Sequence, residues 1–389
     1  MNLSEAKLMA NEYMMHTYTP YDVLFVKGEG SYLYDDNNKS YLDLFSGIAV
    51  NNLGNCHNSL VKAITNQAKT LMHVSNLYYS EPALKTAQAL VEVSKMDKVF
   101  FCNSGTEANE GALKLARLYG QPKNKQKVVS AINSFHGRTF GGLSLTGQTK
   151  YHQGFQPIVP GITYTSFNDI AALKRDLTTD TAALFLECVQ GEGGVRPATQ
   201  EYLETARKLC DDLDILLIFD EVQTGIGRTG EFLAYQVYGI KPDIITLAKG
   251  LGGGLPFGAI LANKKAAVFS PGTHASTFGG NPVAAAAANV VISEVSQAKF
   301  LTEVKEKATL FDDLLNKPHP LIKEVRGLGL MLGIELSIPA NLVVKEALKE
   351  GVVVGTAGEN VLRLLPPLTI TKKEIEKGVE LIFKALSRF

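Results

Sequence analysis

The sequence predicts an α/β fold with two domains: a large domain with a mostly parallel sheet covered by helices, and a smaller α+β domain. The chain has 389 residues, more than a single hydrophobic core usually organises. Short, β-branched-rich apolar runs such as 215–219 and 244–248 show no polar alternation, which is typical of strands buried in a parallel sheet. These runs alternate with helical patterns from about residue 58, so helices should lie on both faces of the sheet.

The expected elements follow in chain order. The first helix is expected at 4–15, followed by two strands at 32–35 and 41–44 that a turn connects. In the alternating part, the expected helices are 58–72, 81–94, 107–119, 200–212 and 230–238. The expected buried strands are 97–102, 127–132, 182–187, 215–219, 243–247 and 257–261.

An alanine-rich helix at 281–297 is expected to connect the two domains. Beyond it, strands are expected at 328–336, 351–355 and 361–365, with a last helix at 371–388. The predicted division is an N-terminal segment (1–45) that contributes to the small domain, a large domain (46–278) and a small domain (279–389).

The composition excludes several classes of function. Lys and Arg together number 39, as do Asp and Glu, so no overall basic charge favours nucleic acid or anionic membranes. No apolar stretch approaches membrane-spanning length, and the first 15 residues do not resemble a secretory signal. The four cysteines lack metal-binding spacing, and the histidines lack zinc-site pairing, so no metal is expected. Reduced, buried thiols indicate a cytoplasmic protein.

Two ionisable residues follow buried strands: Asp220 follows 215–219, and Lys249 follows 244–248. Both therefore stand at strand ends beside glycine-rich sequence. An amine and an acid placed in this way suit pyridoxal phosphate, because the amine forms a Schiff base and the acid keeps the pyridine nitrogen protonated. The alternative interpretation is a salt bridge at the sheet edge, but the neighbouring motifs favour a functional site.

The segment 103–109 follows a predicted strand and begins a helix. A turn of small residues at a helix start presents free backbone N–H groups and the positive end of the helix dipole, which suits a phosphate. Ser104 or Thr106 can cap this helix as well as bind the anion. Taken alone, this segment is better explained by a plain N-cap with a glycine in the turn.

The segment 135–138 follows the strand predicted at 127–132. Phe135 at a strand exit can stack on a flat cofactor, and Arg138 can form a bidentate pair with a substrate carboxylate. The alternatives are core packing for the phenylalanine and a surface ion pair for the arginine.

Further charged candidates lie in 187–194 and in the last predicted strand. Glu187 and Glu192 stand at a strand end as an acid/base pair or as structural ion-pair partners. Arg363 interrupts an apolar strand, so it must find an anion, either as a structural partner or as a carboxylate-binding residue between the domains. The glycine-rich run 250–254 does not match a dinucleotide-binding pattern.

Together these motifs, with 190–192, 220–225, 248–250 and 276–282, resemble the class III, fold-type I, pyridoxal-phosphate-dependent aminotransferases. The resemblance covers the chain from about residue 18 to the C-terminus. Within the family, the chain most resembles the enzymes that act on N-acetylornithine. One departure is Asn55 and Asn58 where the family usually has histidine and proline.

The resemblance implies roles for individual residues. Lys249 is expected to carry the cofactor and move a proton, while Asp220 pairs with the ring nitrogen. Gln223 should hydrogen-bond the phenolic oxygen of the cofactor, between Phe135 and Val222 on the two ring faces. The cofactor-binding set implied by the resemblance is Ser104, Gly105, Thr106, Phe135, Asp220, Val222, Gln223, Lys249 and Thr277.

The resemblance also implies a homodimer, because Thr277 would reach the phosphate of the neighbouring subunit. The substrates implied are a small amino donor and 2-oxoglutarate. Arg363 would bind the carboxylate beside the reacting carbon of glutamate, and Glu192 would neutralise this arginine when the donor has none. The substrate-binding set is Arg138, Glu192, Arg363, Ser276, Tyr18 and Asn76.

Ornithine aminotransferases carry a tyrosine where this chain has Gly47-Ile48, and that tyrosine binds a free α-amino group. Its absence favours an acylated donor, or one without an α-amino group. We therefore expect transfer of the terminal amino group of N-acetylornithine to 2-oxoglutarate in arginine biosynthesis. Succinylornithine, γ-aminobutyrate and N-acetyl-lysine-type donors are the alternatives within the class, and a non-catalytic protein with the same fold is the alternative outside it.

Overall fold

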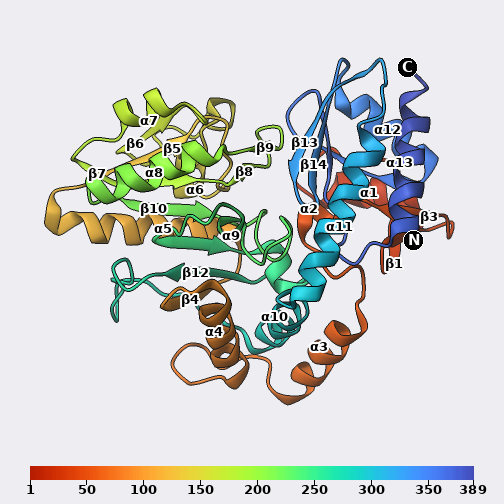
Figure 1. Cartoon of the computed structure of the whole chain (residues 1–389). Helices are drawn as coiled ribbons and strands as arrows, with labels where there is room; N and C mark the ends of the chain where they lie inside the picture. The colour runs from red at the N-terminus through yellow and green to blue at the C-terminus, as the bar shows by residue number, and fades with distance from the viewer.

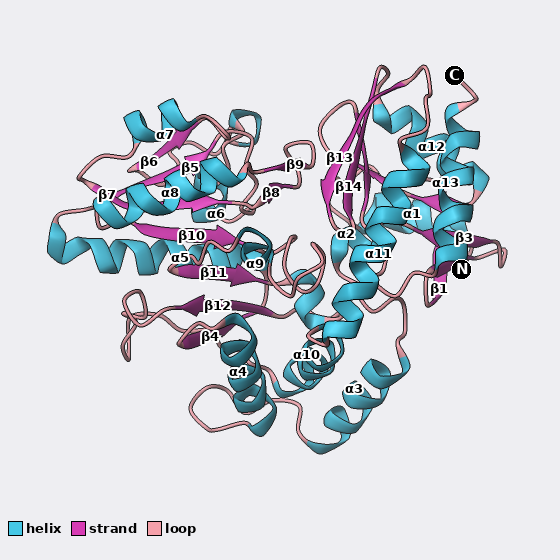
Figure 2. Cartoon of the chain, in the orientation of Figure 1, coloured by secondary structure: helices cyan, strands magenta, loops and turns pink.

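The computed structural model describes all residues from 1 to 389 and has two lobes (Figure 1). One lobe is built on a seven-stranded sheet from the middle of the chain, and the other combines N-terminal strands with the C-terminal third. Both chain ends lie on the second lobe. Figure 2 shows helices around the sheets in both lobes.

The sheet of the large lobe is parallel apart from one strand. β12 is antiparallel to both of its neighbours, and the remaining pairs are parallel. In spatial order the strands are β4 (Lys98–Cys102), β12 (Gly258–Ala262), β11 (Ile244–Leu247), β10 (Leu216–Asp220), β7 (Thr181–Leu186), β5 (Lys127–Ala131) and β6 (Ile162–Thr165). The predicted fold class is thus confirmed.

Alternate residues of the central strands enter two different hydrophobic clusters. In β10, Leu216 and Ile218 pack with α5 (Gly105–Gly120), whereas Leu217 and Phe219 pack on the opposite face with residues of α8 (Gln200–Asp212). Since side chains of a strand alternate between faces, a strand that is covered on both faces has no polar positions. This explains the uninterrupted apolar runs of the sequence.

The other helices of the large lobe differ partly from the prediction. The predicted helix 230–238 is helical only from Ala234 to Tyr238, and β6 and two short helices lie in a region where no element was expected. These helices of the large lobe are α3 (Asn58–Thr70), α4 (Glu81–Ser94), α6 (Phe140–Leu145), α7 (Ile170–Asp176), α9 (Ala234–Tyr238) and α10 (Pro282–Val295).

The small lobe contains two four-stranded sheets. β15 (Val352–Val353) pairs in parallel with β3 (Ser40–Asp43), which joins the two ends of the chain. The other strands are β1 (Phe25–Glu29), β2 (Tyr32–Asp35), β13 (Ile322–Leu328), β14 (Met331–Leu336), β16 (Gly355–Thr356) and β17 (Val361–Leu364). The helices are α1 (Leu3–Tyr13), α2 (Ser46–Ala49), α11 (Ala298–Leu315), α12 (Ala340–Glu350) and α13 (Lys372–Leu386).

The single strand predicted at 328–336 is wrong, because the chain reverses direction there. Gly329 has a φ of +60°, and a Cβ at this position would lie 2.5 Å from the carbonyl oxygen of Arg228. The turn therefore needs glycine, and it separates β13 from β14, which pair as a hairpin. No helix of the chain combines the length and the apolar character that crossing a bilayer requires.

Candidate active site

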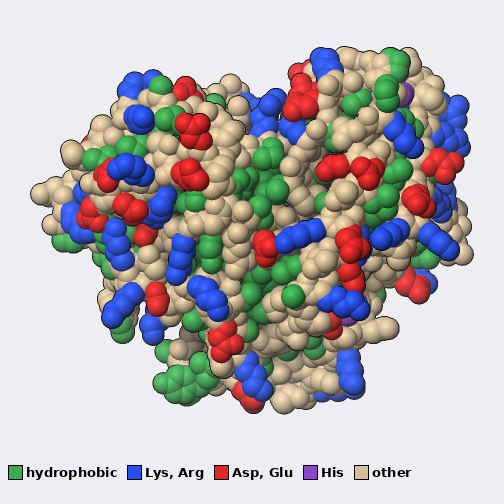
Figure 3. Space-filling model, in the orientation of Figure 1, with side chains coloured by type: hydrophobic (Ala, Val, Ile, Leu, Met, Phe, Trp, Pro, Cys, Tyr) green, Lys and Arg blue, Asp and Glu red, His purple; other side chains and the backbone are tan.

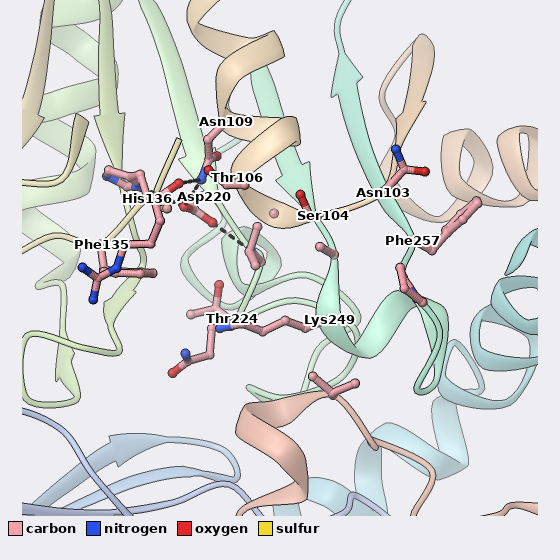
Figure 4. Close-up of a pocket in the computed structure, with 18 of the residues that line it drawn as sticks. Asn103, Ser104, Thr106, Asn109, Phe135, His136, Asp220, Thr224, Lys249 and Phe257 are labelled. Atoms are coloured by element: carbon pink, nitrogen blue, oxygen red, sulfur yellow. Dashed lines mark hydrogen bonds and ion pairs between the residues drawn. The ribbon is translucent and has the colours of Figure 1, made fainter. Parts of the chain in front are cut away.

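A cavity of about 460 Å³ opens at the ends of the central strands, and it brings together residues that lie far apart in the sequence. Lys249 and Asp220 both line it. Asp220 is the last residue of β10, and Lys249 follows the end of β11. Figure 4 shows both side chains beside the same hollow, and Figure 3 shows a depression between the two lobes. The volume is in the range of small-molecule sites.

Lys249 occupies the first position of a short helical turn that ends at Gly252. Its φ of +44° lies in the left-handed region, which is uncommon for a residue with a side chain and is found preferentially at functional sites. Burial lowers the pKa of the Lys249 amine; the Glu192 carboxylate opposes this shift, and the charge of Arg363 adds to it. A lowered pKa leaves more of the amine unprotonated and therefore nucleophilic.

The Asp220 carboxylate receives hydrogen bonds on both oxygens. Oδ2 accepts from Asn109 Nδ2 and from His136 Nδ1, each at 2.7 Å, and Oδ1 accepts from the backbone N–H of Val222 at 2.9 Å. The dashed lines in Figure 4 mark such contacts at this residue. Three donors stabilise a negative charge on a side chain that is almost completely buried.

The start of α5 forms one end of the cavity. The Ser104 hydroxyl accepts from the Glu107 N–H at 3.3 Å, so Ser104 is the N-cap, and Thr106 Oγ1 lies 2.7 Å from Thr139 Oγ1. First-turn N–H groups have no partner inside a helix and so remain available to an anion. A Cβ on Gly105 would lie 2.6 Å from Val222, which shows how closely the backbone approaches the opposite wall.

The side walls of the cavity carry Phe135 and Val222. The Phe135 N–H donates to Glu187 Oε2 at 3.2 Å, so this carboxyl holds the backbone that presents the ring. A flat ring between these two walls, a phosphate at the α5 N-terminus, an acid and an amine are mutually consistent. The residues present therefore fit pyridoxal phosphate.

Arg363, in β17, pairs with Glu192 at 2.6 Å, and its Nη1 also lies 3.3 Å from Gln223 Oε1. The arginine side chain is only 3% exposed. Burial alone would raise the pKa of Glu192, but the charge of Arg363 and its hydrogen bond outweigh burial and lower that pKa. Both Glu192 and Gln223 line the cavity, whereas Arg363 lies behind them and lines a neighbouring hollow that Glu192 also borders.

Arg138 also lines the cavity, but it has no carboxylate partner. Its guanidinium lies 4.0 Å from the centre of the Tyr151 ring and 5.5 Å from that of Phe135. Contact with two aromatic rings fixes its direction without neutralising its charge. The arginine is therefore free to bind a carboxylate.

Five predicted site residues do not line the cavity of this single chain: Arg363, which lies behind Glu192, and Tyr18, Asn76, Ser276 and Thr277. Tyr18 is 83% exposed, and Thr277 is exposed on a loop. Asn76 Nδ2 donates to the carbonyl oxygens of Ser276 and Gly279 at 2.8 and 2.9 Å, which ties two loops together. A single chain thus brings the predicted cofactor-binding residues together around the cavity, with the exception of Thr277.

Sequence reasoning assigned no role to several residues that the structure places at the site. Asn109 and His136 stood inside recognised motifs without a role of their own, and Glu187 was considered as an acid or base or as a structural ion-pair partner. Burial raises the pKa of Glu187 well above its usual value, and the negative charge of Asp220 adds to the effect. Burial also raises the pKa of Glu221 to about 7, although two backbone N–H groups counteract it.

A left-handed turn lies beside the cavity, where α2 was assigned. Ser46, Gly47, Ile48 and Ala49 have φ values of +50°, +60°, +68° and +60°. The Asp43 carboxylate accepts from the N–H groups of the first two residues of this bend, Phe45 and Ser46, and so holds it. Val50, the next residue, lines the cavity. This left-handed conformation could not be predicted from the sequence, because only one of the four residues is glycine.

Comparison with known proteins agrees with this geometry. The model of the aminotransferase class-III family matches residues 13–386, so the chain belongs to this family, whose members depend on pyridoxal phosphate. The fold and the cavity thus define a pyridoxal-phosphate-dependent aminotransferase.

Individual relatives are similar over almost their whole length. The acetylornithine aminotransferase of Caldanaerobacter subterraneus subsp. tengcongensis is 50% identical over 383 residues, which cover 97% of this chain and 98% of the relative. An N-acetylornithine aminotransferase structure from Stenotrophomonas maltophilia has a TM-score of 0.86 at 36% identity, covering 98% of each chain. The ornithine aminotransferase of Toxoplasma gondii reaches a TM-score of 0.95 at 31% identity, covering 100% of this chain and 96% of that one.

Proposed function

We propose that the protein transfers the terminal amino group of N-acetylornithine to 2-oxoglutarate, giving N-acetylglutamate semialdehyde and glutamate, as a step of arginine biosynthesis. The observation that carries the proposal is the buried Glu192–Arg363 pair, because its Glu192 lines the same cavity as the unpaired Arg138. The 50% identity to an acetylornithine aminotransferase supports the same substrate.

The two half-reactions place different demands on the arginines. Glutamate has a carboxylate beside its reacting carbon, and this group binds Arg363 after Glu192 moves away, while its distant carboxylate binds Arg138. The terminal amine of N-acetylornithine has no such neighbour. Without Glu192, Arg363 would then be a buried, unpaired charge that costs several kcal/mol in order of magnitude. The α-carboxylate of this donor binds Arg138 instead.

Discrimination against free ornithine is assigned to the turn that contains Gly47 and Ile48. Neither residue has a hydroxyl for a free α-amino group, and Ile48 is 39% exposed on the left-handed turn. An apolar side chain here leaves an ammonium group without a partner, and desolvating it is unfavourable. An acylated nitrogen carries no charge and avoids this cost.

Pyridoxal phosphate supplies the electron sink when it is bound. Lys249 holds it covalently and moves the proton at the substrate carbon, and Asp220 holds the proton on the ring nitrogen. Gln223 orients the ring through its phenolic oxygen, and Phe135 and Val222 restrict it from the two faces. The phosphate is held by Gly105 and Thr106, with Ser104 as the cap that fixes their N–H groups.

We further propose a homodimer in which Thr277 of one subunit completes the phosphate site of the other. Apolar side chains are strongly exposed beside this loop: Leu77 is 86%, Tyr79 92% and Phe278 59% exposed. A group of exposed apolar residues favours a protein partner. In the dimer, Ser276, Asn76 and Tyr18 would then border the substrate entrance.

The domain division is also part of the proposal: a large domain from 46 to 278, a small domain from 279 to 389, and the segment 1–45 associated with the latter. The pairing of β3 with β15 supports the association of 1–45 with the C-terminal part. α10, at the start of the segment 279–389, packs on α3 and α4 of the large lobe and so links the two domains. A cytoplasmic location is supported by the free cysteines, three of which are buried.

Steady-state kinetics with a panel of amino donors tests the substrate. We expect the highest kcat/KM with N-acetylornithine and lower values with ornithine, γ-aminobutyrate, succinylornithine and N-acetyl-lysine. A clear preference for γ-aminobutyrate would overturn the substrate assignment. Borohydride reduction followed by peptide mass analysis should find the cofactor on Lys249, and a protein that carries none would overturn the catalytic assignment.

A further inference from the structure

Asp220 is a buried carboxylate whose two oxygens are both hydrogen-bonded. It accepts from Asn109, from His136 and from the backbone N–H of Val222. A carboxylate that is removed from water needs donors directed at its oxygens. The groups that hold these donors in place therefore help to position Asp220.

Asn109 supplies one of those donors, and its amide has a single consistent orientation. Nδ2 donates to Asp220 Oδ2 at 2.7 Å and to the His136 carbonyl oxygen at 2.8 Å. Both neighbours are acceptors, so the two N–H bonds of this amide are used. A flipped amide would place its oxygen against a carboxylate and a carbonyl, which is unfavourable.

Thr246 binds the carbonyl oxygen of the same amide. Its hydroxyl donates to Asn109 Oδ1 at 2.7 Å, and both residues are buried. Thr246 lies in β11, three positions before Lys249, and does not line the cavity. Its backbone pairs with that of Asp220 across β11 and β10, but its hydroxyl reaches the Asp220 carboxylate only through the amide that comes from α5.

We infer that Thr246 and Asn109 form a positioning chain that keeps Asp220 charged and directed at the ring nitrogen of the cofactor. This inference rests on the proposed pairing of Asp220 with that nitrogen. Asn109 donates directly to the carboxylate, and the Thr246 hydroxyl donates to Oδ1 of that amide and so holds it in place. His136 is the second side-chain donor to the Asp220 carboxylate, so loss of the Thr246 hydroxyl weakens the positioning of this carboxylate without abolishing it.

The test measures the protonation of the ring nitrogen rather than turnover. Each variant is loaded with cofactor labelled with ¹⁵N in the ring, and the ¹⁵N chemical shift is followed as a function of pH, together with the dissociation constant of the cofactor. Thr246→Val removes only the hydroxyl at nearly constant volume. Because one hydrogen bond contributes about 0.5–1.5 kcal/mol, we expect the ring nitrogen to lose its proton roughly three- to tenfold more readily.

Three further variants separate this role from general packing. Thr246→Ser keeps the hydroxyl and should restore the wild-type titration. Thr165→Val removes a buried hydroxyl of the same sheet that has no partner and should leave the titration unchanged. Asn109→Ala should exceed the effect of Thr246→Val, and the double variant should equal Asn109→Ala, because the threonine acts through the amide.

The outcomes divide as follows. A wild-type titration in Thr246→Val, additive effects in the double variant, or an equal shift in Thr165→Val would each overturn the inference. Asp220→Ala serves as the reference for the underlying pairing: if the ring nitrogen keeps its proton in that variant, the proposed role of Asp220 itself fails. Thermal unfolding of each cofactor-free variant verifies that the folded state is retained.

Discussion

The cofactor cavity and the neighbouring loops 71–80 and 276–281 are built in opposite ways. Around Asp220, both carboxylate oxygens accept hydrogen bonds from neighbouring groups, and the aspartate is buried. In the two loops, Asn76 and Asn281 fix the backbones to each other, yet Leu77, Tyr79 and Phe278 remain exposed. The first region is buried and hydrogen-bonded, whereas the second is ordered by hydrogen bonds and still leaves large apolar side chains exposed. This difference supports the proposed contact of the two loops with a second subunit.

The largest effect is expected from Lys249→Ala, which removes the amine from the cavity. Activity should fall at least about a thousandfold, because a positioned acid–base group alone contributes about 10²–10⁴-fold. The measurement is kcat/KM for the amino donor, together with loss of the borohydride adduct. Lys208→Ala, on the exposed face of α8, is the matched control and should retain full activity. Retained turnover in Lys249→Ala would contradict the assignment.

The second effect concerns Glu221, a buried acid directly after Asp220 in the sequence. The pKa of Glu221 rises from 4.5 to about 7 on folding, so the folded protein binds this proton more tightly than the unfolded chain. Its contribution to stability is therefore complete below pH 4.5 and is lost as the pH rises through about 7. The loss amounts to about 3 kcal/mol, since one pKa unit corresponds to about 1.4 kcal/mol.

Urea unfolding of the cofactor-free protein between pH 4.5 and 8 measures this dependence. Glu221→Gln should remove that part of the slope, and Glu204→Gln, an exposed residue of α8, should preserve it. Parallel curves for wild type and Glu221→Gln would show that the folded environment does not favour the protonated acid.

The third effect tests directly whether the loop region is completed by a second subunit. Thr277→Ala should weaken cofactor binding about 10- to 100-fold, as expected for a hydrogen bond to a charged group. In a mixed dimer of Lys249→Ala and Thr277→Ala subunits, one site combines an intact Lys249 with an intact Thr277 from the partner. That site should regain wild-type cofactor affinity.

Mixed dimers can be prepared with two different affinity tags, and their cofactor content can be titrated by absorbance. If the mixed dimer binds cofactor no better than the Thr277→Ala homodimer, the threonine acts within its own chain. The contrast between the two regions would then not hold.

The smallest effect concerns Glu192, at the boundary between cofactor and substrate. Glu192→Ala leaves Arg363 buried without its partner at 2.6 Å. We expect the half-reaction with N-acetylornithine to slow about tenfold more than that with glutamate, whose own carboxylate can replace the missing one. Single-turnover rates of the two half-reactions provide the comparison. Equal losses of rate in the two half-reactions would contradict the proposal that Glu192 and the glutamate carboxylate alternate as partners of Arg363.

Much of the cavity could be predicted because its residues stand at strand ends. The apolar runs before Asp220 and Lys249 became β10 and β11, and the helix expected at 107–119 is the observed α5. Such local patterns report burial on both faces of a sheet. The contact between Asn109 and Thr246, by contrast, joins residues 137 positions apart, and no local pattern reveals it.

The other differences arise from backbone geometry that short-range patterns do not describe. The hairpin of β13 and β14 was taken for one strand, because the apolar residues continue through Gly329. The small-lobe sheet needs β3 and β15, which are more than 300 residues apart. Thr277 could be singled out only through the family resemblance, because its proposed ligand belongs to another subunit.

The left-handed turn at 46–49 has a consequence for how the enzyme can change. Left-handed conformations cost residues with side chains roughly 1–2 kcal/mol each, and three of these four residues are not glycine. The sum is a sizeable fraction of a typical folding free energy. Selection for heat tolerance would favour glycine here, and a glycine at position 48 would still offer no hydroxyl to a free α-amino group. Under the proposed discrimination, relieving the strain of this bend in the laboratory should therefore raise thermostability without admitting ornithine.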